Sequence, residues 1–538
     1  MILAIDVGTS SLKAVLYDGD GHIAGTSARR YSYQSAQSGW AEADPEDWWQ
    51  ALGQALADLS GQGLALGQVE ALSFTGQMHT AVLLDSTGRV IPPTILWLDR
   101  RASQETEDLQ RELRLPPHQL NSTYTLPKLL WLHRHQPAVL AQVDKILWPK
   151  DYLRFRLTGE VCTDLTEPGG SALLDWDSRT WATERLAMVG LGAGVLPPIR
   201  PAHASGGSIR PEAFQALGLN PRAHVVVGMG DVAALFGAAP PRPGRAICSL
   251  GSSSMVFVPL REDQRVKDPS DRVYVYPFGP YPMLGGVSST TGSSLVWACE
   301  KLGKGFGQAR PALLPQCGTG GLAPTGEPGL FDACVAEALQ VEPGAAGLVF
   351  LPYLAGERSP HWSDEIRGGF YGLQLTHAGR HLVRAVMEGV AYSMRHLLDL
   401  CAEAGAPVDE IALAGGGTAT PGWPQIFADV CQREVRIYAE AETVTRVLYA
   451  LCQQHLGRGG FADRLLQTFA DIPPCLRSTA SLAVSTCATG AGTGGTGQAF
   501  GHEDRTQVHP NRAVQDIYQG GYQRYRAFAE FARQQAGL

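Results

Sequence analysis

The chain begins with two apolar segments, residues 2–6 and 12–16, on either side of a short run of small residues, 8–11 (GTSS). Asp6 ends the first segment, and a second turn, residues 18–21 (DGDG), follows the other. Apolar runs bounded by turns rich in glycine and serine predict a β-hairpin.

Segments typical of strands and helices alternate after this hairpin. A strand is predicted over residues 69–75, and helices are predicted over 43–59, with Asp44 as the N-cap, and over 103–113, with Ser103 as the N-cap. Regular alternation of strands and helices predicts an α/β protein.

A second hairpin is predicted near the middle of the chain. Residues 247–258 repeat the order of apolar strand, Gly-Ser loop and apolar strand. The 538 residues are also too many for one hydrophobic core, because cores stop growing beyond roughly 250–300 residues. We therefore expect a duplicated architecture with a boundary within residues 240–245 (PPRPGR), an N-terminal lobe over 1–243 and a C-terminal lobe over 244–538.

The composition excludes several classes of protein. The net charge of −8 argues against a nucleic-acid partner, because nucleic-acid-binding proteins present a basic face. No stretch approaches the ~20 apolar residues of a membrane span, and the N-terminus lacks the features of a signal peptide. The ten cysteines stand singly, without metal-ligand spacing. We expect a cytoplasmic protein with reduced cysteines and neither a membrane nor a nucleic-acid partner.

The turn of the first hairpin is a candidate phosphate-binding loop. Backbone N–H groups in such a loop can face phosphate oxygens, because residues as small as Gly8 and Thr9 allow close approach. Asp6 at the strand end would hold Mg²⁺, and Lys13 would add a cation. A plain hairpin turn is the alternative interpretation.

Two more glycine-rich turns follow predicted strands. Residues 225–237 (VVVGMGDVAALFG) place Asp231 at the start of a helix, where it could accept the proton of a hydroxyl that attacks a phosphoryl group. An ordinary helix cap is the alternative for this acid. Gly415, Gly416 and Gly417 end another strand with backbone that suits a flat ring or a phosphate, and a simple tight turn is the alternative there.

A further set of side chains suits a sugar. Gln77, Met78 and His79 follow a predicted strand, and Asp99 follows Trp97 later in the chain. Together they offer donors, acceptors and a ring face for a polyhydroxylated carbon skeleton. For His79 taken alone, a buried histidine with satisfied hydrogen bonds is the better interpretation.

Taken in order, these segments resemble the FGGY carbohydrate kinases, a branch of the actin-like ATPase superfamily. The resemblance runs almost end to end along the motifs DVGTSSLKA, WAEADPEDWW, GQMH, WLDRRA, PKLLWL, PKDYLRFRLTG, GMGDVAA, SLGSSS, PYLAGERSPHW, GGFYGL and LAGGG. It implies an α/β fold with two actin-like (ribonuclease H-like) lobes and an interlobe cleft. It also implies transfer of the γ-phosphate of ATP to a terminal hydroxyl of a small sugar.

The resemblance assigns roles to residues. Asp231 would be the general base. The residues expected to bind the sugar are Gln77, Met78, His79, Asp99 and Asp231. Those expected to bind ATP are Gly8, Thr9, Lys13, Gly251, Ser252, Ser253, Gly415, Gly416 and Gly417, with Mg²⁺ organised by Asp6. The Gln-Met-His triplet is most similar to the xylulokinases, so D-xylulose is the expected substrate.

The sequence departs from the family pattern in three places. Leu98 stands where bacterial xylulokinases usually have Asn, and Thr80 stands where Gly is usual. Residues 445–450 (TRVLYA) replace a helix of small residues, which puts the bulky Tyr449 at an expected contact between the lobes. A further tract, residues 489–497 (TGAGTGGTG), has no counterpart in the family and is predicted to be a surface loop.

Two alternatives stay open. One is a sibling kinase that acts on ribulose, gluconate, a polyol or a signalling furanose. The other is a non-catalytic regulator that binds a sugar or a nucleotide, against which the presence of Asp6, Lys13 and Asp231 argues. Homodimers are common in the family, and nothing in the sequence independently indicates an interface.

Overall fold

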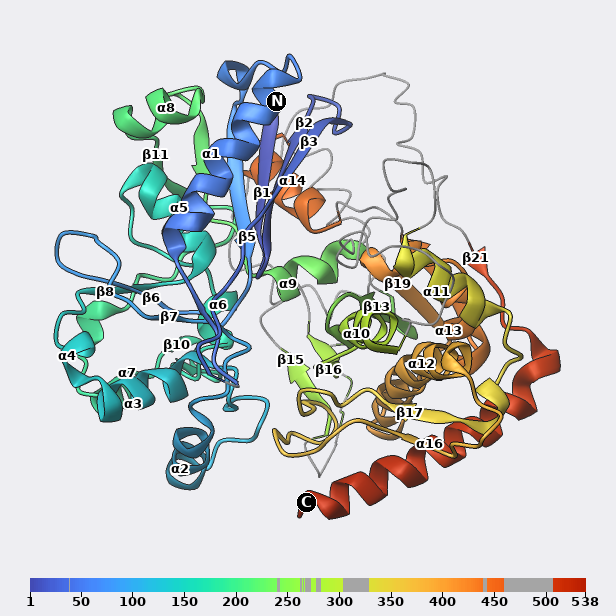
Figure 1. The fold of residues 1–538 in the computed structure, drawn as a ribbon. Coiled ribbons are helices and arrows are strands. Elements are labelled where there is room, and N and C mark those ends of the chain that lie inside the picture. The colour runs from blue at the N-terminus through green and yellow to red at the C-terminus, as the bar shows by residue number, and fades with distance from the viewer. Residues whose placement is uncertain are drawn as a thin grey trace. The chain divides into compact units, whose positions relative to one another are not determined.

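The chain forms two compact units in a computed structural model (Figure 1). The structure describes residues 1–302, 329–438, 443–458 and 507–538, apart from 38, 240–241, 262–263, 265, 267–271 and 277–281. Unit 1 comprises Met1–Gly237 and a returning segment that contains helix α14 (Thr443–His455), and unit 2 comprises Ala238–Ala441 and Ala470–Leu538. The tract 489–497 lies outside the described residues.

Unit 1 is built on a six-stranded sheet with the strand order β11-β12-β5-β1-β2-β3. The strands are β1 (Ile2–Val7), β2 (Ser11–Tyr17), β3 (Ile23–Arg30), β5 (Ala71–Gly76), β11 (Ser205–Ser208) and β12 (His224–Val226). β1 pairs antiparallel with β2, which is the first predicted hairpin, and parallel with β5, which in turn pairs parallel with β12. The ends of β1, β5 and β12 therefore meet at one edge of the sheet, where three of the predicted site segments begin.

Both faces of this sheet are covered by helices. Side chains alternate along β1, so Leu3 and Ile5 pack with helix α1 (Pro45–Gly61), whereas Ile2 and Ala4 pack with α14. Helices α5 (Pro149–Thr158) and α8 (Pro211–Leu217) lie with α1 (Figure 1). Burial on both faces explains why residues 2–5 are apolar without alternation.

The predicted helix starts differ in outcome. Asp44 caps α1 as predicted, because its side chain accepts a hydrogen bond from the amide of Glu46 at 2.9 Å. The second helix, α2, spans Ser103–Leu113, but its N-cap is Ala102. The hydroxyl of Ser103 donates to the carbonyl of Arg100 at 2.8 Å instead of accepting from the helix, so the prediction of Ser103 as the N-cap is wrong.

The rest of unit 1 consists of short elements around a second hydrophobic cluster, which includes Trp131 and Trp148. The additional helices are α3 (Thr125–His135), α4 (Pro137–Leu140), α6 (Thr166–Gly169), α7 (Thr183–Ala187) and α9 (Asp231–Leu235). The small sheets pair β4 (Glu42–Ala43) with β7 (Thr94–Ile95), β6 (Val82–Leu84) with β8 (Lys145–Leu147), and β9 (Leu174–Asp175) with β10 (Thr180–Trp181).

Unit 2 repeats the connectivity of unit 1. Its sheet has the order β15-β16-β14-β13-β19-β20-β21, and β13 pairs antiparallel with β14 and parallel with β19, as β1 does with β2 and β5. The strands are β13 (Arg245–Leu250), β14 (Ser254–Pro259), β15 (Tyr274–Tyr276), β16 (Met283–Ser288), β19 (Glu410–Ala414), β20 (Glu434–Tyr438) and β21 (Gln507–Val508). The second predicted hairpin is β13–β14, and the predicted duplicated α/β architecture is confirmed.

Helix α12 (Gly379–Glu403) runs through the core of unit 2 and packs against β17 (Val349–Leu351), which pairs with β18 (Gly369–Tyr371). The other helices are α10 (Gly292–Leu302), α11 (Leu330–Leu339), α13 (Trp423–Cys431) and α16 (Gln515–Gln535). In α16, Tyr518, Tyr522 and Tyr525 pack around Tyr392 of α12. Among the described helices, none combines the length and apolar character needed to cross a membrane.

Candidate active site

The turn after β12 positions the candidate general base, Asp231, at the first residue of α9. Gly228 has φ +80°, and a side chain there would collide with the carbonyl oxygen of Phe74. A methyl group at Gly230 would lie 2.7 Å from Sδ of Met78. The sequence Gly-Met-Gly-Asp therefore lets the turn approach β5 and Met78 closely, with Asp231 half-buried beside them.

Gln77 joins the candidate sugar residues to the first hairpin loop. Its amide donates to the carbonyl of Val7 at 2.9 Å, and its side-chain Nε2 donates to the carbonyl of Gly8 at 3.3 Å. The hydroxyl of Thr80 lies 3.4 Å from Oε1 of Gln77. With only 2% of its surface exposed, Gln77 is a structural link between two predicted sites.

His79 is held in a left-handed conformation, with φ 70°. Its Nδ1 donates to the carbonyl of Gly170, which fixes a proton on this nitrogen and makes Nε2 the acceptor of the neutral ring. The ring stacks on Tyr124, with 4.8 Å between the centroids. Met78, next to it, is 96% buried, so the triplet is a rigid feature of unit 1.

Trp97 connects Thr9 and Thr80. Its indole Nε1 donates to the hydroxyl of Thr9 at 2.9 Å, and its amide donates to the hydroxyl of Thr80 at 3.1 Å. Thr80 is fully buried. The threonine that departs from the family pattern thus has its hydroxyl satisfied within the protein.

Asp6 lies at the end of β1, in register with Lys13 of β2 and with Thr75 of β5. It is half-buried, and together with burial its charge raises the pKa of Tyr31 well above the usual range. Tyr31 donates to the carbonyl of Gly8 at 2.6 Å. A half-buried carboxylate at a strand end, beside a loop of small residues, fits the hard oxygen ligand that Mg²⁺ requires.

Asp99 is placed differently from the expectation for a sugar ligand. Its side chain is 0% exposed, and both of its oxygens accept hydrogen bonds from Arg101, at 2.8–3.0 Å. The amide of Ala41 also donates to it. Arg101 in turn pairs with Glu42 and lies over the ring of Trp40. The geometry makes Asp99 the partner of a buried arginine.

Beneath the Asp231 turn lies a group of charges that the sequence analysis missed, the buried charge cluster of Lys150, Asp151, Arg154 and Asp164. The exposed fraction of each of these side chains is 2% or less. Lys150 pairs with Asp151 at 2.7 Å and with Asp164 at 3.0 Å, and Arg154 pairs with Asp151 at 2.9 Å. Burial alone would lower the pKa of Lys150, but the neighbouring acids outweigh burial and raise it.

This buried charge cluster holds the turn that carries Asp231. Arg154 donates to the carbonyl of Val227 at 2.9 Å, while Asp164 accepts from the hydroxyl of Thr166 at 2.6 Å. The same hydroxyl accepts from the amide of Gly230 at 2.8 Å. The signal in the sequence was the motif PKDYLRFRLTG, which places Lys150, Asp151 and Arg154 on the buried part of helix α5.

In unit 2, the loop between β13 and β14 carries Gly251, Ser252 and Ser253. The carbonyls of Gly251 and Ser252 accept hydrogen bonds from the amides of Gly292 (2.8 Å) and Thr291 (2.9 Å) at the start of α10. Ser252 is exposed. Because the carbonyls are bound to α10, the loop has a fixed shape, as a phosphate-binding turn requires.

The three glycines after β19 lie against the same loop. Gly415 has φ +95°, and side chains at Gly415 or Gly417 would come within 2.9 Å of the carbonyl oxygen of Leu250. Leu250 immediately precedes Gly251. The structure therefore brings together two of the segments predicted to bind ATP, Gly251–Ser253 and Gly415–Gly417, within unit 2.

The expectation for Tyr449 is corrected. Residues 445–450 were assigned to the C-terminal lobe (244–538) and to a contact between lobes, whereas α14 packs on β1 and β5 inside unit 1. Tyr449 is 4% exposed, with its ring 5.1 Å from that of Tyr17, and its hydroxyl accepts from Gln453 at 2.6 Å. The large side chain fills space next to the first hairpin.

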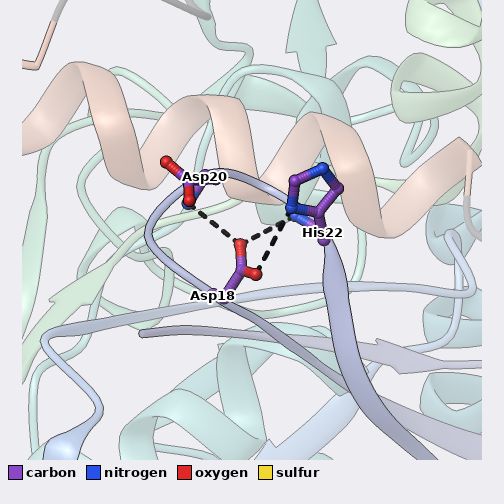
Figure 2. A group of neighbouring side chains, drawn as sticks. All are labelled: Asp18, Asp20 and His22. Carbon is purple, nitrogen blue, oxygen red and sulfur yellow. Dashed lines mark hydrogen bonds and ion pairs between the residues drawn. The ribbon is translucent and has the colours of Figure 1, made fainter. Parts of the chain in front are cut away.

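One exposed group has the composition of a metal site. Asp18, Asp20 and His22 place one ligand atom each within 4.8 Å of one another (Figure 2). Oδ1 of Asp18 accepts from the amides of Asp20 and His22, both at 2.9 Å, and His22 contacts the other oxygen at 3.4 Å. These bonds are those of an Asp-initiated turn, which accounts for the group without a metal.

Comparison with known proteins identifies the family. The model for the N-terminal domain of the FGGY family of carbohydrate kinases matches residues 1–237, and that for the C-terminal domain matches residues 246–446. The chain belongs to the FGGY family of carbohydrate kinases. This membership confirms the predicted two-lobed fold class and the predicted enzyme class, a sugar phosphotransferase.

Individual relatives of this chain include kinases of two different sugars. The chain is 33% identical to the xylulose kinase of Escherichia coli strain K12 over 442 residues, which is 81% of this chain and 86% of that protein. It is 26% identical to the gluconokinase of Bacillus subtilis strain 168, over 81% and 83% of the two chains. The crystal structure of a "xyloylose kinase" from Brucella ovis matches with a TM-score of 0.75 and 27% identity, and covers 98% of each chain.

Proposed function

We propose that this kinase transfers the γ-phosphate of ATP to the terminal hydroxyl of D-xylulose and forms D-xylulose 5-phosphate. The observation that carries the proposal is the position of Asp231, on a turn packed against Met78 and hydrogen-bonded to Thr166. The similarity to proteins named xylulose kinase supports the choice of sugar.

Asp231 is the proposed general base. A half-buried carboxylate at a fixed helix start can accept the proton of the sugar hydroxyl as that hydroxyl attacks phosphorus. Met78 and His79 are proposed to bind the sugar, through packing and through the acceptor Nε2 of the imidazole. Gln77 and Asp99 are proposed to position these groups, because their polar atoms are bonded within the protein.

The residues proposed to bind ATP are those that the family resemblance assigns. They are Gly8, Thr9 and Lys13 in the first hairpin, and the paired segments Gly251–Ser253 and Gly415–Gly417 in the second sheet. Asp6 would hold Mg²⁺, which supplies positive charge to the phosphates. A cytoplasmic location and a homodimer stay predictions.

A sugar acid is the second candidate substrate. The similarity to a gluconokinase extends over 81% of the chain, and Leu98 removes an amide that the xylulokinase pattern usually has. A non-catalytic regulator stays the alternative from another class.

The first experiment is to measure ADP release from Mg·ATP with a panel of ketoses, polyols and sugar acids. The proposal expects stimulation by D-xylulose well above that by D-gluconate or D-ribulose. Stimulation by D-gluconate alone would change the proposed substrate to gluconate, while the proposed kinase activity would stand. No phosphorylation of any sugar, with ATP still bound, would favour the regulator.

A further inference from the structure

Glu167 is a buried acid for which the mechanism above has no use. It lies in α6, with 0% of its surface exposed. Within the described part of the chain, neither Oε1 nor Oε2 has a hydrogen-bond partner. Buried polar groups are nearly always paired, and an unpaired one costs about 1–3 kcal/mol, so such a group calls for an explanation.

The neighbouring charges indicate which form of Glu167 is present. In the buried charge cluster, the two cations Lys150 and Arg154 are already balanced by the two carboxylates of Asp151 and Asp164. An ionised Glu167 would therefore add an uncompensated charge in a buried place. Burial raises the pKa of Glu167 well above its usual range, and Asp151, Asp164 and Asp231 raise it further against the opposing effect of Lys150.

The chain around Glu167 touches the candidate sugar residues on two sides. Thr166, which precedes it, accepts from the amide of Gly230, the residue before Asp231. Gly170, which follows α6, binds Nδ1 of His79 through its carbonyl and leaves no room for a side chain beside that ring. The short segment 166–170 thus lies against both halves of the proposed sugar site.

We propose that Glu167 is a specificity-determining residue that binds a hydroxyl of the polyol substrate through its protonated carboxyl group. A carboxylic acid can both donate to and accept from one hydroxyl, which matches a sugar carbon next to the one that is phosphorylated. The amide of Gly230, the residue before Asp231, donates to Thr166, the residue before Glu167, so the two acids follow bonded neighbours and can contact neighbouring hydroxyls of one ligand. This inference rests on the proposed function.

The test compares Glu167→Leu and Glu167→Gln, with Glu184→Gln as a control on an exposed part of α7. Glu167→Leu loses the hydrogen bond, so KM for D-xylulose should rise by about 10- to 100-fold while KM for ATP changes less than about twofold. Glu167→Gln keeps a donor and an acceptor and should recover most of this loss. The control should match the wild type.

The pH profile provides a second measurement. As pH rises through the raised pKa of Glu167, the acid loses its O–H donor and places a second negative charge near Asp231, so kcat/KM of the wild type should decline on the alkaline side. The charged groups that face it are Lys150, Asp151, Asp164 and Asp231, and His79 lies in the same region. Glu167→Gln cannot ionise and should lack this part of the decline.

Deoxy analogues of xylulose provide a third measurement, and if Glu167→Leu folds poorly the pH profiles of the wild type and Glu167→Gln still test the inference. Removal of one particular hydroxyl of xylulose should raise KM about equally for the wild type and for Glu167→Gln. The same removal should have little effect on KM for Glu167→Leu. The inference would be overturned if KM for D-xylulose were unchanged in Glu167→Leu, or if KM rose equally in the Gln and Leu variants. If the wild type phosphorylates no sugar at all, that result contradicts the proposed function itself and not only the role of Glu167.

Discussion

The guanidinium of Arg101 binds both carboxylate oxygens of Asp99, and the two side chains are 1% and 0% exposed. The pair lies between Glu42 and Trp40, so the arginine is enclosed by an acid and an aromatic ring as well. A sequence motif that looks like a sugar-binding acid is thus the anchor of a buried ion pair.

Asp99→Ala tests this assignment. Removal of one partner of a buried pair leaves Arg101 with only Glu42, so the free energy of unfolding should fall by about 3–5 kcal/mol. Chemical denaturation checks this, with Glu530→Ala of the exposed Glu530–Arg533 pair as the control with little effect. Unchanged stability with a large rise in KM for the sugar would make Asp99 a direct ligand.

Gly170→Ala should weaken sugar binding through His79. The added methyl group would press on the imidazole, which is held by Tyr124 and cannot shift freely. We expect KM for the sugar to rise about tenfold, a loss of about 1.4 kcal/mol, with KM for ATP retained. Gly192→Ala is the matched control, since a methyl there meets no atom within 4 Å. Equal KM values in both variants would contradict this coupling.

Asp231→Asn should lower kcat by about 10²–10⁴-fold, because the amide cannot accept the hydroxyl proton. Sugar affinity, measured by calorimetry, should stay within about threefold, since the turn is held by Gly230 and Val227. Asp177→Asn on an exposed turn serves as the control. Near-normal turnover in Asp231→Asn would remove Asp231 from the role of base.

Tyr449→Ala should destabilise unit 1. The ring is nearly fully buried against Tyr17, and loss of a buried aromatic side chain costs about 3–5 kcal/mol. Tyr449→Phe keeps the ring and leaves Gln453 without its acceptor, so a loss of about 1 kcal/mol is expected. Denaturant unfolding checks both values. A fully stable alanine variant would show that α14 contributes little to the core of unit 1.

Stability should depend on pH through Glu357. Burial raises the pKa of this acid from 4.5 to about 7, against the hydrogen bonds from Ser288, Ser289 and Arg358. The folded state therefore holds a proton that the unfolded state has lost, and the free energy of unfolding should decrease as pH rises from about 4.5 to about 7, at up to about 1.4 kcal/mol per unit.

Glu357→Gln cannot ionise and should remove this part of the decrease. The measurement is the difference in free energy of unfolding between wild type and variant at pH 5, 6, 7 and 8. Other buried acids with a raised pKa, such as Glu388, are present in both proteins and cancel. Parallel curves for the two proteins would contradict the assignment.

The features predicted from the sequence are local ones. Both hairpins and the cap at Asp44 depend on neighbouring residues, and the Gly-rich turns at Gly228 and Gly415 follow their strands directly. The site prediction named residues at the strand ends of unit 1 but not the buried charge cluster that supports them. The link from Lys150 through Asp164 and Thr166 to Gly230 joins residues 80 positions apart, and no local pattern specifies such a pairing.

The contacts of Asp99 and Tyr449 could not be predicted for related reasons. An acid after a tryptophan has the same appearance whether it binds a sugar or an arginine, and only the fold determines that Arg101 closes on it. The segment that contains Tyr449 is amphipathic like any surface helix, so its period predicts a helix but not the sheet that it covers.

Helix α14 has a consequence for any attempt to divide the gene. A fragment of residues 1–243 would contain every strand of the first sheet but would expose Ile2, Ala4 and Val15 to water, because the helix that covers them, α14, begins only at Thr443. Such a half-protein should aggregate, and co-expression with a peptide spanning residues 443–458 should restore a soluble form. The first unit is therefore a discontinuous folding module, completed only after the ribosome has translated most of the second.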